Sequence, residues 1–391
     1  MARYTELLIK HVHVLRSDGI LAESGVLVNE GVITFVGEIT PAMEQTAQQV
    51  IDGGGMYLSP GLIDSHTHGG IGLDFLTANP DEIQQLLSWY ASNGVTRVLP
   101  TLSAGLKPEF LASCEKLEAF KRNHPLGEHI GGINIEGPYI NPGRKGAQPL
   151  DEENPVSPDQ VDDYLGYFKD AVRVMTLAPE IDGGMDLLAY LAQNGIICSI
   201  GHSKASYEET LQAIGLGLKR TTHTFNGMDP FHHRQPGIVG AAMVSDAVYS
   251  EITLDGFHVH PGAAKALMRA KGYEKVVLIT DSMQAAGLGD GEFIRPGNRK
   301  IFVKDGVARL ESGSIAGSVL TLNRAVANAV NFLDIPLNKA VAMASENVAN
   351  SLGLMHVGRI VKGCKADLMI HNAEMEVFYT FKQGKQVYRR E

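Results

Sequence analysis

Two histidines stand two positions apart at the end of an apolar run, in the segment GLIDSHTHGG (61–70). Side chains of a strand alternate between its two faces, so His66 and His68 would point to the same side and could bind one metal ion. The same spacing occurs twice more in the chain, at His11/His13 and at His258/His260. Spacing alone therefore does not select a site, and the choice depends on the elements that carry each pair.

Short apolar runs recur through the middle of the chain, most of them separated by segments with apolar residues at helical spacing. There are eight runs, at 61–68, 95–102, 130–139, 172–180, 196–203, 219–226, 250–259 and 276–283. Alternation of strand and helix, counted to eight, predicts an α/β fold of the (β/α)8 TIM-barrel type. In such a barrel the chemistry lies at the carboxyl ends of the strands.

Six of these runs end in ionisable residues, namely His66, His68, Glu136, His202, His223, His258 and Asp281. Any one of them alone is more often structural, as a buried histidine with a backbone partner or an aspartate that caps a helix. Their common register favours a site, because a barrel would bring all of them to one mouth. Imidazole and carboxylate groups together are typical ligands of divalent transition metals.

Both ends of the chain have the short alternating runs, broken by Gly and Asp, that are typical of strands. We expect residues 1–58 and 358–391 to pair as an antiparallel, small β-sandwich domain, and residues 59–357 to form the barrel domain. His11 and His13 fall in the middle of a strand of the first segment, where a surface role is expected. Two helical patterns, at 318–333 and 336–354, follow the eighth run.

The composition excludes several classes of protein. The 391 residues carry a formal charge of −10 with acids and bases interspersed, and no basic stripe indicates nucleic-acid binding. No apolar run reaches the roughly 18 residues of a membrane helix, and the start lacks a signal-peptide core. The three cysteines are scattered and form no disulfide or metal-binding pattern, so a cytoplasmic location is expected.

Longer motifs are more specific than the His-x-His spacing: PGLIDSHTHGG, NIEGPYINPGRKGAQ, SIGHS, THTFNGM, HHRQPG, LDGFHV, LITDSM and SIAGS. With these motifs the chain resembles the amidohydrolase superfamily, and more closely its N-acetylglucosamine-6-phosphate deacetylases. The segment GRIVKGCKADLMI near the end is also typical of the superfamily's small sheet domain. The resemblance covers nearly the whole chain.

The resemblance implies a metal centre of one or two divalent ions. His66 and His68 with Glu136 would hold one ion, and Glu136 would bridge to a second ion held by His202 and His223. Zn²⁺ suits these donors best, and Fe²⁺ or Mn²⁺ also fits them. Asp281 would be the general base and then the general acid, although the residues alone leave open that ITDS is a helix cap.

The implied reaction hydrolyses the acetamide of N-acetyl-D-glucosamine 6-phosphate to D-glucosamine 6-phosphate and acetate, in amino-sugar catabolism. Arg234 would clamp the phosphate, reaching in from the neighbouring subunit of a homodimer. Some relatives carry histidine where Gln148 stands, which leaves the role of Gln148 open. The residues implied to contact the substrate are Ala147, Gln148, Asn226, Gly227, Arg234, His258 and Ile315.

Two alternatives remain at this point. Another amidohydrolase, such as a cyclic-amide hydrolase or an N-acyl-amino-acid deacylase, would share the metal ligands but would not need the phosphate site of Arg234 with Asn226 and Gly227. A non-catalytic scaffold relative would have lost metal ligands, whereas every implied ligand is present in this chain.

Overall fold

The structure, a computed structural model, describes residues 5–103, 107–148, 158–295 and 299–391. The chain divides into two compact units, and each combines segments that are distant in the sequence. The first unit consists of Met1–Asp64, Leu87–Arg97 and Leu322–Glu391, and the second of Ser65–Leu86 and Val98–Thr321.

Eight strands form one continuous sheet in the order β15-β14-β13-β12-β11-β10-β9-β6. They are β6 (Leu62–Thr67), β9 (Val95–Ser103), β10 (Ile133–Glu136), β11 (Val172–Leu177), β12 (Ile197–Ile200), β13 (Arg220–Thr221), β14 (Tyr249–Thr253) and β15 (Val276–Ile279). Neighbours from β9 to β15 pair in parallel. The eight strands lie in or beside the eight apolar runs, and the predicted barrel is confirmed.

Backbone contacts just beyond the last strand bring the two edges of this sheet together. The amide of Asp281 donates to the carbonyl of His66 at 2.9 Å, and the amide of His68 donates to the carbonyl of Ser282 at 2.8 Å. The sheet is therefore a nearly closed barrel, and its two edges approach each other beside the predicted catalytic residue.

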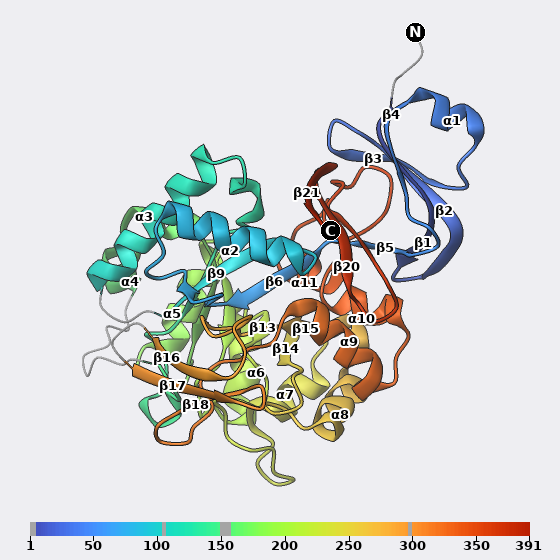
Figure 1. The fold of residues 1–391 in the computed structure, drawn as a ribbon. Helices are drawn as coiled ribbons and strands as arrows, with labels where there is room; N and C mark the ends of the chain where they lie inside the picture. The colour runs from blue at the N-terminus through green and yellow to red at the C-terminus, as the bar shows by residue number, and fades with distance from the viewer. Residues whose placement is uncertain (1–4, 104–106, 149–157, 296–298) are drawn as a thin grey trace. The chain divides into compact units, whose positions relative to one another are not determined.

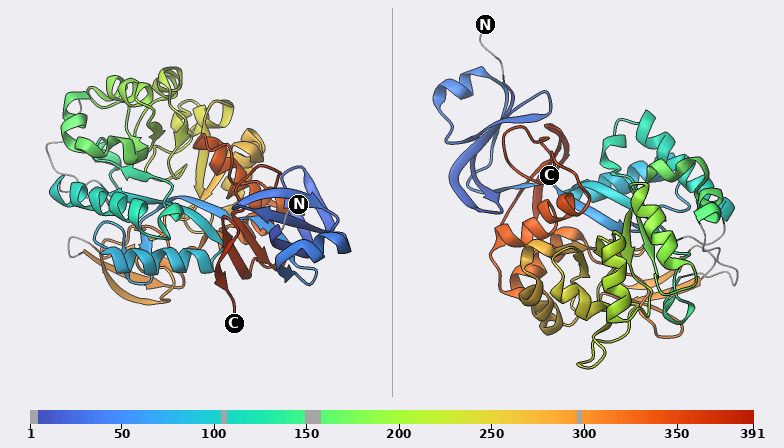
Figure 2. Two further views of the ribbon diagram at one scale, coloured as in Figure 1. Left: turned by 90° about the horizontal axis from the view of Figure 1, so that it is seen from above. Right: turned by 180° about the vertical axis from the view of Figure 1, so that it is seen from behind.

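Helices alternate with the barrel strands in the sequence. They are α2 (Pro80–Ser92), α3 (Lys107–Asn123), α4 (Pro158–Leu165), α5 (Gly184–Gln193), α6 (Tyr207–Leu216), α7 (Gly237–Val244) and α8 (Pro261–Lys271). Helices α5 to α8 lie outside the strands (Figures 1 and 2). Helix α6 begins with a capping box of Ser206 and Glu209, and α8 begins after His260, whose ring accepts from the amide of Gly262. His260 thus caps the amino end of α8.

Strands from both ends of the chain combine in a second sheet, ordered β21-β20-β19-β5-β1-β2-β3, with β4 paired to β1. They are β1 (Thr5–Arg16), β2 (Gly19–Asn29), β3 (Val32–Gly37), β4 (Ala47–Asp52), β5 (Tyr57–Pro60), β19 (Leu368–His371), β20 (Val377–Lys382) and β21 (Lys385–Arg389); the short helix α1 (Pro41–Thr46) precedes β4. In Figure 1 the blue strands from the start of the chain and the red strands from its end lie together in this sheet. Their apolar residues share one buried cluster, which includes Val14, Val26 and Phe381.

The pairing within this second sheet differs in part from the expected antiparallel pattern. Strand β1 pairs in parallel with both β4 and β5, while the other adjacent pairs are antiparallel. Helix α1 and the turn after β4 let the chain return twice in the direction of β1, which a direct hairpin would not allow. His11 lies at a positive φ of 52°, and its exposed ring faces the exposed carboxylate of Asp52.

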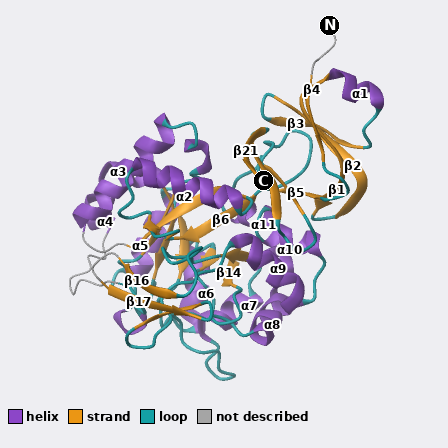
Figure 3. Cartoon of the chain, in the orientation of Figure 1, coloured by secondary structure: helices purple, strands orange, loops and turns teal. Residues whose placement is uncertain are grey.

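Two groups of elements follow the last barrel strand in the sequence and precede β19. A three-stranded antiparallel sheet, which the sequence analysis did not predict, is formed by β16 (Gly291–Arg295), β17 (Arg299–Lys304) and β18 (Val307–Leu310). Helix α9 (Leu322–Leu333) follows, and the predicted helix at 336–354 is divided into α10 (Leu337–Met343) and α11 (Glu346–Ser351). Figure 3 separates these helices and strands by colour.

The remaining short elements are the two-residue strands β7 (Gly69–Gly70) and β8 (Leu73–Asp74), and the 3₁₀ turns η1 (Gly127–His129), η2 (Pro142–Arg144), η3 (Gly166–Ala171) and η4 (Tyr273–Lys275). Within the described ranges, none of the helices has the length and apolar character required to cross a bilayer.

Candidate active site

The carboxyl ends of the barrel strands carry the predicted ligands. His66 lies near the end of β6 and Glu136 is the last residue of β10. His202, His223 and Asp281 each stand two residues beyond β12, β13 and β15, at positive φ angles of 49°, 30° and 49°. Such backbone is uncommon for residues other than glycine and costs about 1–3 kcal/mol. Three barrel strands thus share the same strained exit from the sheet.

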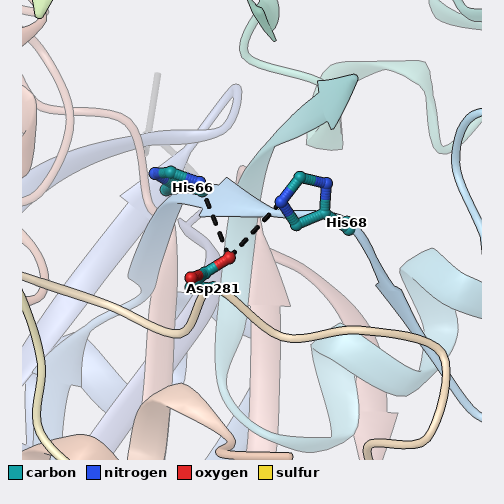
Figure 4. A group of neighbouring side chains, drawn as sticks. All are labelled: His66, His68 and Asp281. Carbon is teal, nitrogen blue, oxygen red and sulfur yellow. Dashed lines mark ion pairs between the residues drawn. The ribbon is translucent and has the colours of Figure 1, made fainter. Parts of the chain in front are cut away.

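The first group of side chains consists of His66, His68 and Asp281 (Figure 4). The Oδ1 atom of Asp281 lies 3.6 Å from Nε2 of His66 and 3.3 Å from Nε2 of His68. The Oε2 atom of Glu136 lies on the same side, 3.7 Å and 3.2 Å from these two nitrogens. Two imidazoles and two carboxylates therefore surround one point.

The second group consists of Glu136, His202 and His223. The Oε1 atom of Glu136 lies 2.9 Å from Nε2 of His202 and 3.0 Å from Nε2 of His223. Glu136 thus directs one carboxylate oxygen toward each group. This is the placement that a ligand shared by two ions requires.

Hydrogen bonds on the outer ring nitrogens fix the tautomers of the second group. Nδ1 of His202 lies 2.8 Å from the carbonyl of Arg144, and Nδ1 of His223 lies 3.1 Å from the carbonyl of Asn226. A carbonyl only accepts, so each Nδ1 carries a hydrogen and, in the neutral ring, each Nε2 carries a lone pair. The two Nε2 atoms are 3.1 Å apart. Two lone pairs at this distance repel one another unless a cation lies between them, so the donor set fits a divalent ion.

Opposite charges within the pocket stabilise one another. Burial lowers the pKa of His68, but hydrogen bonds to Asp281 and Glu136 outweigh this effect and raise the pKa to about 9. Burial also lowers the pKa of His66, but the nearby carboxylates, above all that of Glu136, outweigh burial, and the pKa is raised well above its usual value. Burial raises the pKa of Asp281, but the hydrogen bond to His68 outweighs it and the pKa is lowered. Asp281 is therefore a carboxylate at neutral pH, and bound metal would compete with protons for these histidines.

A cavity of about 170 Å³ opens onto both groups. Of the residues predicted to contact substrate, six line this cavity: Ala147, Gln148, Asn226, Gly227, His258 and Ile315. Arg234 does not line it, and its guanidinium instead lies 2.9 Å from Nε2 of His233 at an exposed position. The structure therefore brings together every predicted site residue of this chain except Arg234.

Two of the lining residues have contacts that suggest their roles. The amide nitrogen of Gln148 donates to Oε2 of Glu136, the oxygen that faces the first group. Nδ1 of His258 lies 2.6 Å from Oδ2 of Asp255. Burial lowers the pKa of His258, but this hydrogen bond outweighs it and the pKa is raised. His258 thus offers the cavity a ring that readily carries positive charge.

Sequence reasoning missed three residues of this site. Asp255, which orients His258, belongs to the LDGFHV motif and stands three positions before its histidine, so the signal was present. Gly146 and Gly317 also line the cavity, and both have positive φ angles, of 55° and 71°. They follow a lysine and an alanine in motifs already singled out, but nothing in the sequence indicates that their backbone faces the cavity.

Comparison with known proteins gives one matching family model and several similar enzymes. The model of the Amidohydrolase family matches residues 57–387. The N-acetylglucosamine-6-phosphate deacetylase of Vibrio furnissii is 35% identical over 332 residues, which are 85% of this chain and 83% of that protein. The N-acetylgalactosamine-6-phosphate deacetylase of Escherichia coli O157:H7 is 34% identical over 375 residues, 95% of this chain and 98% of that protein.

A solved structure is similar to nearly the whole chain. A mutant N-acetyl-D-glucosamine-6-phosphate deacetylase from Mycobacterium smegmatis, in complex with N-acetyl-D-glucosamine-6-phosphate, has a TM-score of 0.89 and is 29% identical. The match covers 98% of this chain and 99% of that one.

Proposed function

This chain belongs to the amidohydrolase family, and we propose that it hydrolyses the acetamide of N-acetyl-D-glucosamine 6-phosphate to D-glucosamine 6-phosphate and acetate, in amino-sugar catabolism. One observation carries the proposal. Glu136 directs one oxygen to each of two imidazole pairs at the floor of a cavity, with Asp281 beside them. Similar enzymes that deacetylate amino-sugar phosphates supply the substrate class.

The metal ligands we propose are the two groups around Glu136. His66 and His68 would hold one ion with Glu136, and His202 and His223 would hold the other; Asp281 is placed to add a ligand to the first. Zn²⁺ suits imidazole and carboxylate donors best, and Fe²⁺ and Mn²⁺ also fit. A bound ion would polarise the acetamide carbonyl and lower the pKa of a coordinated water toward 7.

Asp281 would move the proton of the reaction. As a carboxylate it accepts a proton from the attacking water while the new carbon–oxygen bond forms. It then donates this proton to the amide nitrogen as the carbon–nitrogen bond breaks, so that the amine leaves neutral. Its lowered pKa keeps it ionised before the reaction, and the acidity of the water, rather than the basicity of Asp281, makes the first transfer feasible.

The sugar and phosphate contacts follow from the walls of the cavity. We assign Asn226 and Gly227 as donors to the phosphate, His258 as a charged ring near the sugar or phosphate, and Ile315 as the surface for the acetyl methyl. Ala147 and Gln148 would lie over the sugar. The contact of Gln148 with Glu136 supports a role at the metal ligand as well.

Arg234 completes the proposal at the level of the assembly. Its exposed position, away from the cavity of its own chain, supports a homodimer in which it reaches the phosphate bound by the partner. We further propose that residues 1–58 and 358–391 form the small domain and residues 59–357 the catalytic domain. The three described cysteines are buried and free, which supports a reducing, cytoplasmic location.

The direct test is release of acetate by the purified, metal-loaded protein. N-acetylglucosamine 6-phosphate should be the best substrate, and unphosphorylated N-acetylglucosamine should be far poorer. N-acetylgalactosamine 6-phosphate is the matched control, because an enzyme that acts on this epimer is 34% identical over 95% of the chain.

A preference for N-acetylgalactosamine 6-phosphate would support the proposed deacetylation but would change the proposed sugar. Turnover of cyclic amides or N-acyl amino acids with no turnover of either sugar phosphate would favour another amidohydrolase. The absence of bound metal, together with no activity toward any of these substrates, would favour a non-catalytic scaffold protein.

A further inference from the structure

A glutamate that takes no part in either metal group lies directly behind His66. Glu251 is in β14, it is 1% exposed, and its Oε2 atom lies 3.1 Å from Nδ1 of His66. The same oxygen accepts from the backbone amide of His223 at 3.2 Å. One buried carboxylate oxygen therefore touches the side chain of a residue in the first group and the backbone of a residue in the second.

An arginine holds the other oxygen of this carboxylate. Nε and Nη2 of Arg220 donate to Oε1 of Glu251 at 3.1 Å and 2.8 Å, and Nη2 also donates to Oγ of Ser65 at 2.7 Å. Arg220 is 0% exposed and lies in β13, the strand next to β14. A rigid guanidinium that binds through two nitrogens fixes the carboxylate in both position and orientation.

The histidines of the two metal groups are not all anchored in the same way. The outer nitrogens of His202 and His223 donate to backbone carbonyls of Arg144, in the 3₁₀ turn η2, and of Asn226, in a turn after β13. His66 instead donates from Nδ1 to an ionised carboxylate that is itself fixed between two barrel strands. A charged acceptor makes this hydrogen bond stronger, directs Nε2 to the point shared with Asp281, and increases the electron density that Nε2 can donate.

We propose that Glu251, held by Arg220, is a positioning residue that sets the ring orientation and tautomer of His66 and thereby the affinity of the first group for its metal ion. The inference rests on the metal centre proposed above. Glu251 does not touch the cavity, so it acts through His66 and contributes nothing directly to substrate binding.

Zinc loading of Glu251→Gln tests the proposal. An amide cannot accept hydrogen bonds at both ends, so its NH₂ group must face either Arg220 or the two donors of His66 and His223. We expect the affinity of one of two bound Zn²⁺ ions to fall about 10–100-fold, the usual effect of losing such a partner. The measurement is titration of metal-stripped protein with Zn²⁺ against a chromophoric chelator, with bound zinc counted by elemental analysis.

Two reference variants identify the affected ion. His68→Ala removes a ligand of the first group alone, so Glu251→Gln should weaken the same ion. Asp367→Asn is the matched control: Asp367 is 3% exposed and its ion pair with Lys382, at 2.8 Å, lies in the other compact unit. It removes a buried carboxylate of the same kind, and it should load both ions as the wild type does.

A second variant guards against a loss of folding. Glu251→Leu with Arg220→Met removes both buried charges together, and such replacements are often neutral for stability. This protein should keep its melting temperature in the metal-free form and still bind the first ion about 10–100-fold more weakly. In the nitrogen NMR spectrum of the metal-free protein, the signals of the His66 ring should move away from those of a ring with its hydrogen fixed on Nδ1.

Each result decides the matter. Wild-type loading of both ions by Glu251→Gln or by the double variant, with deacetylation intact, would overturn the positioning role and leave the proposed function standing. Equal losses in Asp367→Asn would also overturn it, because the effect would then be a general one of stability. A wild-type protein that binds no zinc would contradict both the metal centre and this inference.

Discussion

Asp281 is placed for a second role beside the one that the sequence analysis predicted. It was expected to be the general base and then the general acid, and its Oδ1 atom also faces His66 and His68 closely enough for it to share a metal ion with them. A carboxylate can do both when one oxygen binds the ion and the other accepts the proton of the water. With that arrangement the proposed base would lie beside the water that it is to deprotonate.

The first prediction concerns this residue. Asp281→Asn should lower kcat roughly 10²–10⁴-fold, because an amide cannot take the proton from water, while KM changes little. Zinc bound to the group of Glu136, His202 and His223 should remain, as counted by elemental analysis. An unchanged kcat would mean that Asp281 only caps the turn after β15.

The second prediction concerns Glu136, the ligand that we propose to be shared by both ions. Glu136→Ala should remove both ions and all activity, because each oxygen of this carboxylate faces a different pair of imidazoles. His202→Ala should remove one ion together with activity, since it contacts only the Oε1 side. The check is zinc content per chain after dialysis. Full zinc content in His202→Ala would show that the ligand assignment is wrong.

A buried histidine in the second sheet should make the stability of the fold depend on pH. His371 lies in β19, where Nδ1 donates to the carbonyl of Asn372 at 2.7 Å and Nε2 lies 2.5 Å from Oγ of Ser59. Burial lowers its pKa to about 4, against a smaller opposite effect of the Asn372 contact. The histidine of the unfolded chain titrates near 6.5.

The third prediction follows from this difference. Between pH 6.5 and pH 4 the unfolded chain binds a proton at this position that the folded chain does not, so the free energy of unfolding falls as the pH falls. The loss is roughly 3 kcal/mol at pH 4. Urea unfolding of metal-stripped wild type and His371→Gln should therefore show a stability difference that shrinks by about this amount from pH 7 to pH 4. Parallel curves for the two proteins would contradict the prediction.

At the scale of the whole molecule, the unexplained residue is Arg234. A phosphate held by one chain alone would face Asn226, Gly227 and His258, but not this guanidinium. Arg234→Ala should weaken the binding of N-acetylglucosamine 6-phosphate strongly, by about 1.5–3 kcal/mol. It should hardly affect the binding of the unphosphorylated sugar. Relative kcat/KM for the two substrates measures this fourth prediction, and equal losses on both would remove Arg234 from the phosphate site.

The fifth prediction tests whether each site is shared between subunits. Asp281→Asn and Arg234→Ala homodimers each carry a defect at both sites, whereas a mixed dimer would carry both defects at one site and none at the other. With random pairing about half of the dimers are mixed, so activity at low substrate should rise to about a quarter of wild type. Mass spectrometry must show the mixed species, and no recovery in its presence would contradict the shared site.

The sequence by itself determined the barrel and the types of residue that gather at its mouth. Eight apolar runs of strand length must bury themselves, and helical segments between them leave a parallel barrel as the arrangement that does so. The register of His66, Glu136, His202, His223 and Asp281 at the run ends follows from the chain alone, because a parallel barrel collects all carboxyl strand ends at one mouth. Local pattern is enough for such inferences.

Only the tertiary structure decided how these side chains meet. The two-sided contact of Glu136 and the anchoring of His66 by Glu251 join residues separated by 66 to 185 positions along the chain. The placement of His202, His223 and Asp281 depends on strained backbone with positive φ angles. No local propensity encodes such contacts, because strain and buried charge are tolerated only when the surrounding packing fixes them. For the same reason the parallel pairing of β1 and the division between α10 and α11 could not be read from periodicity.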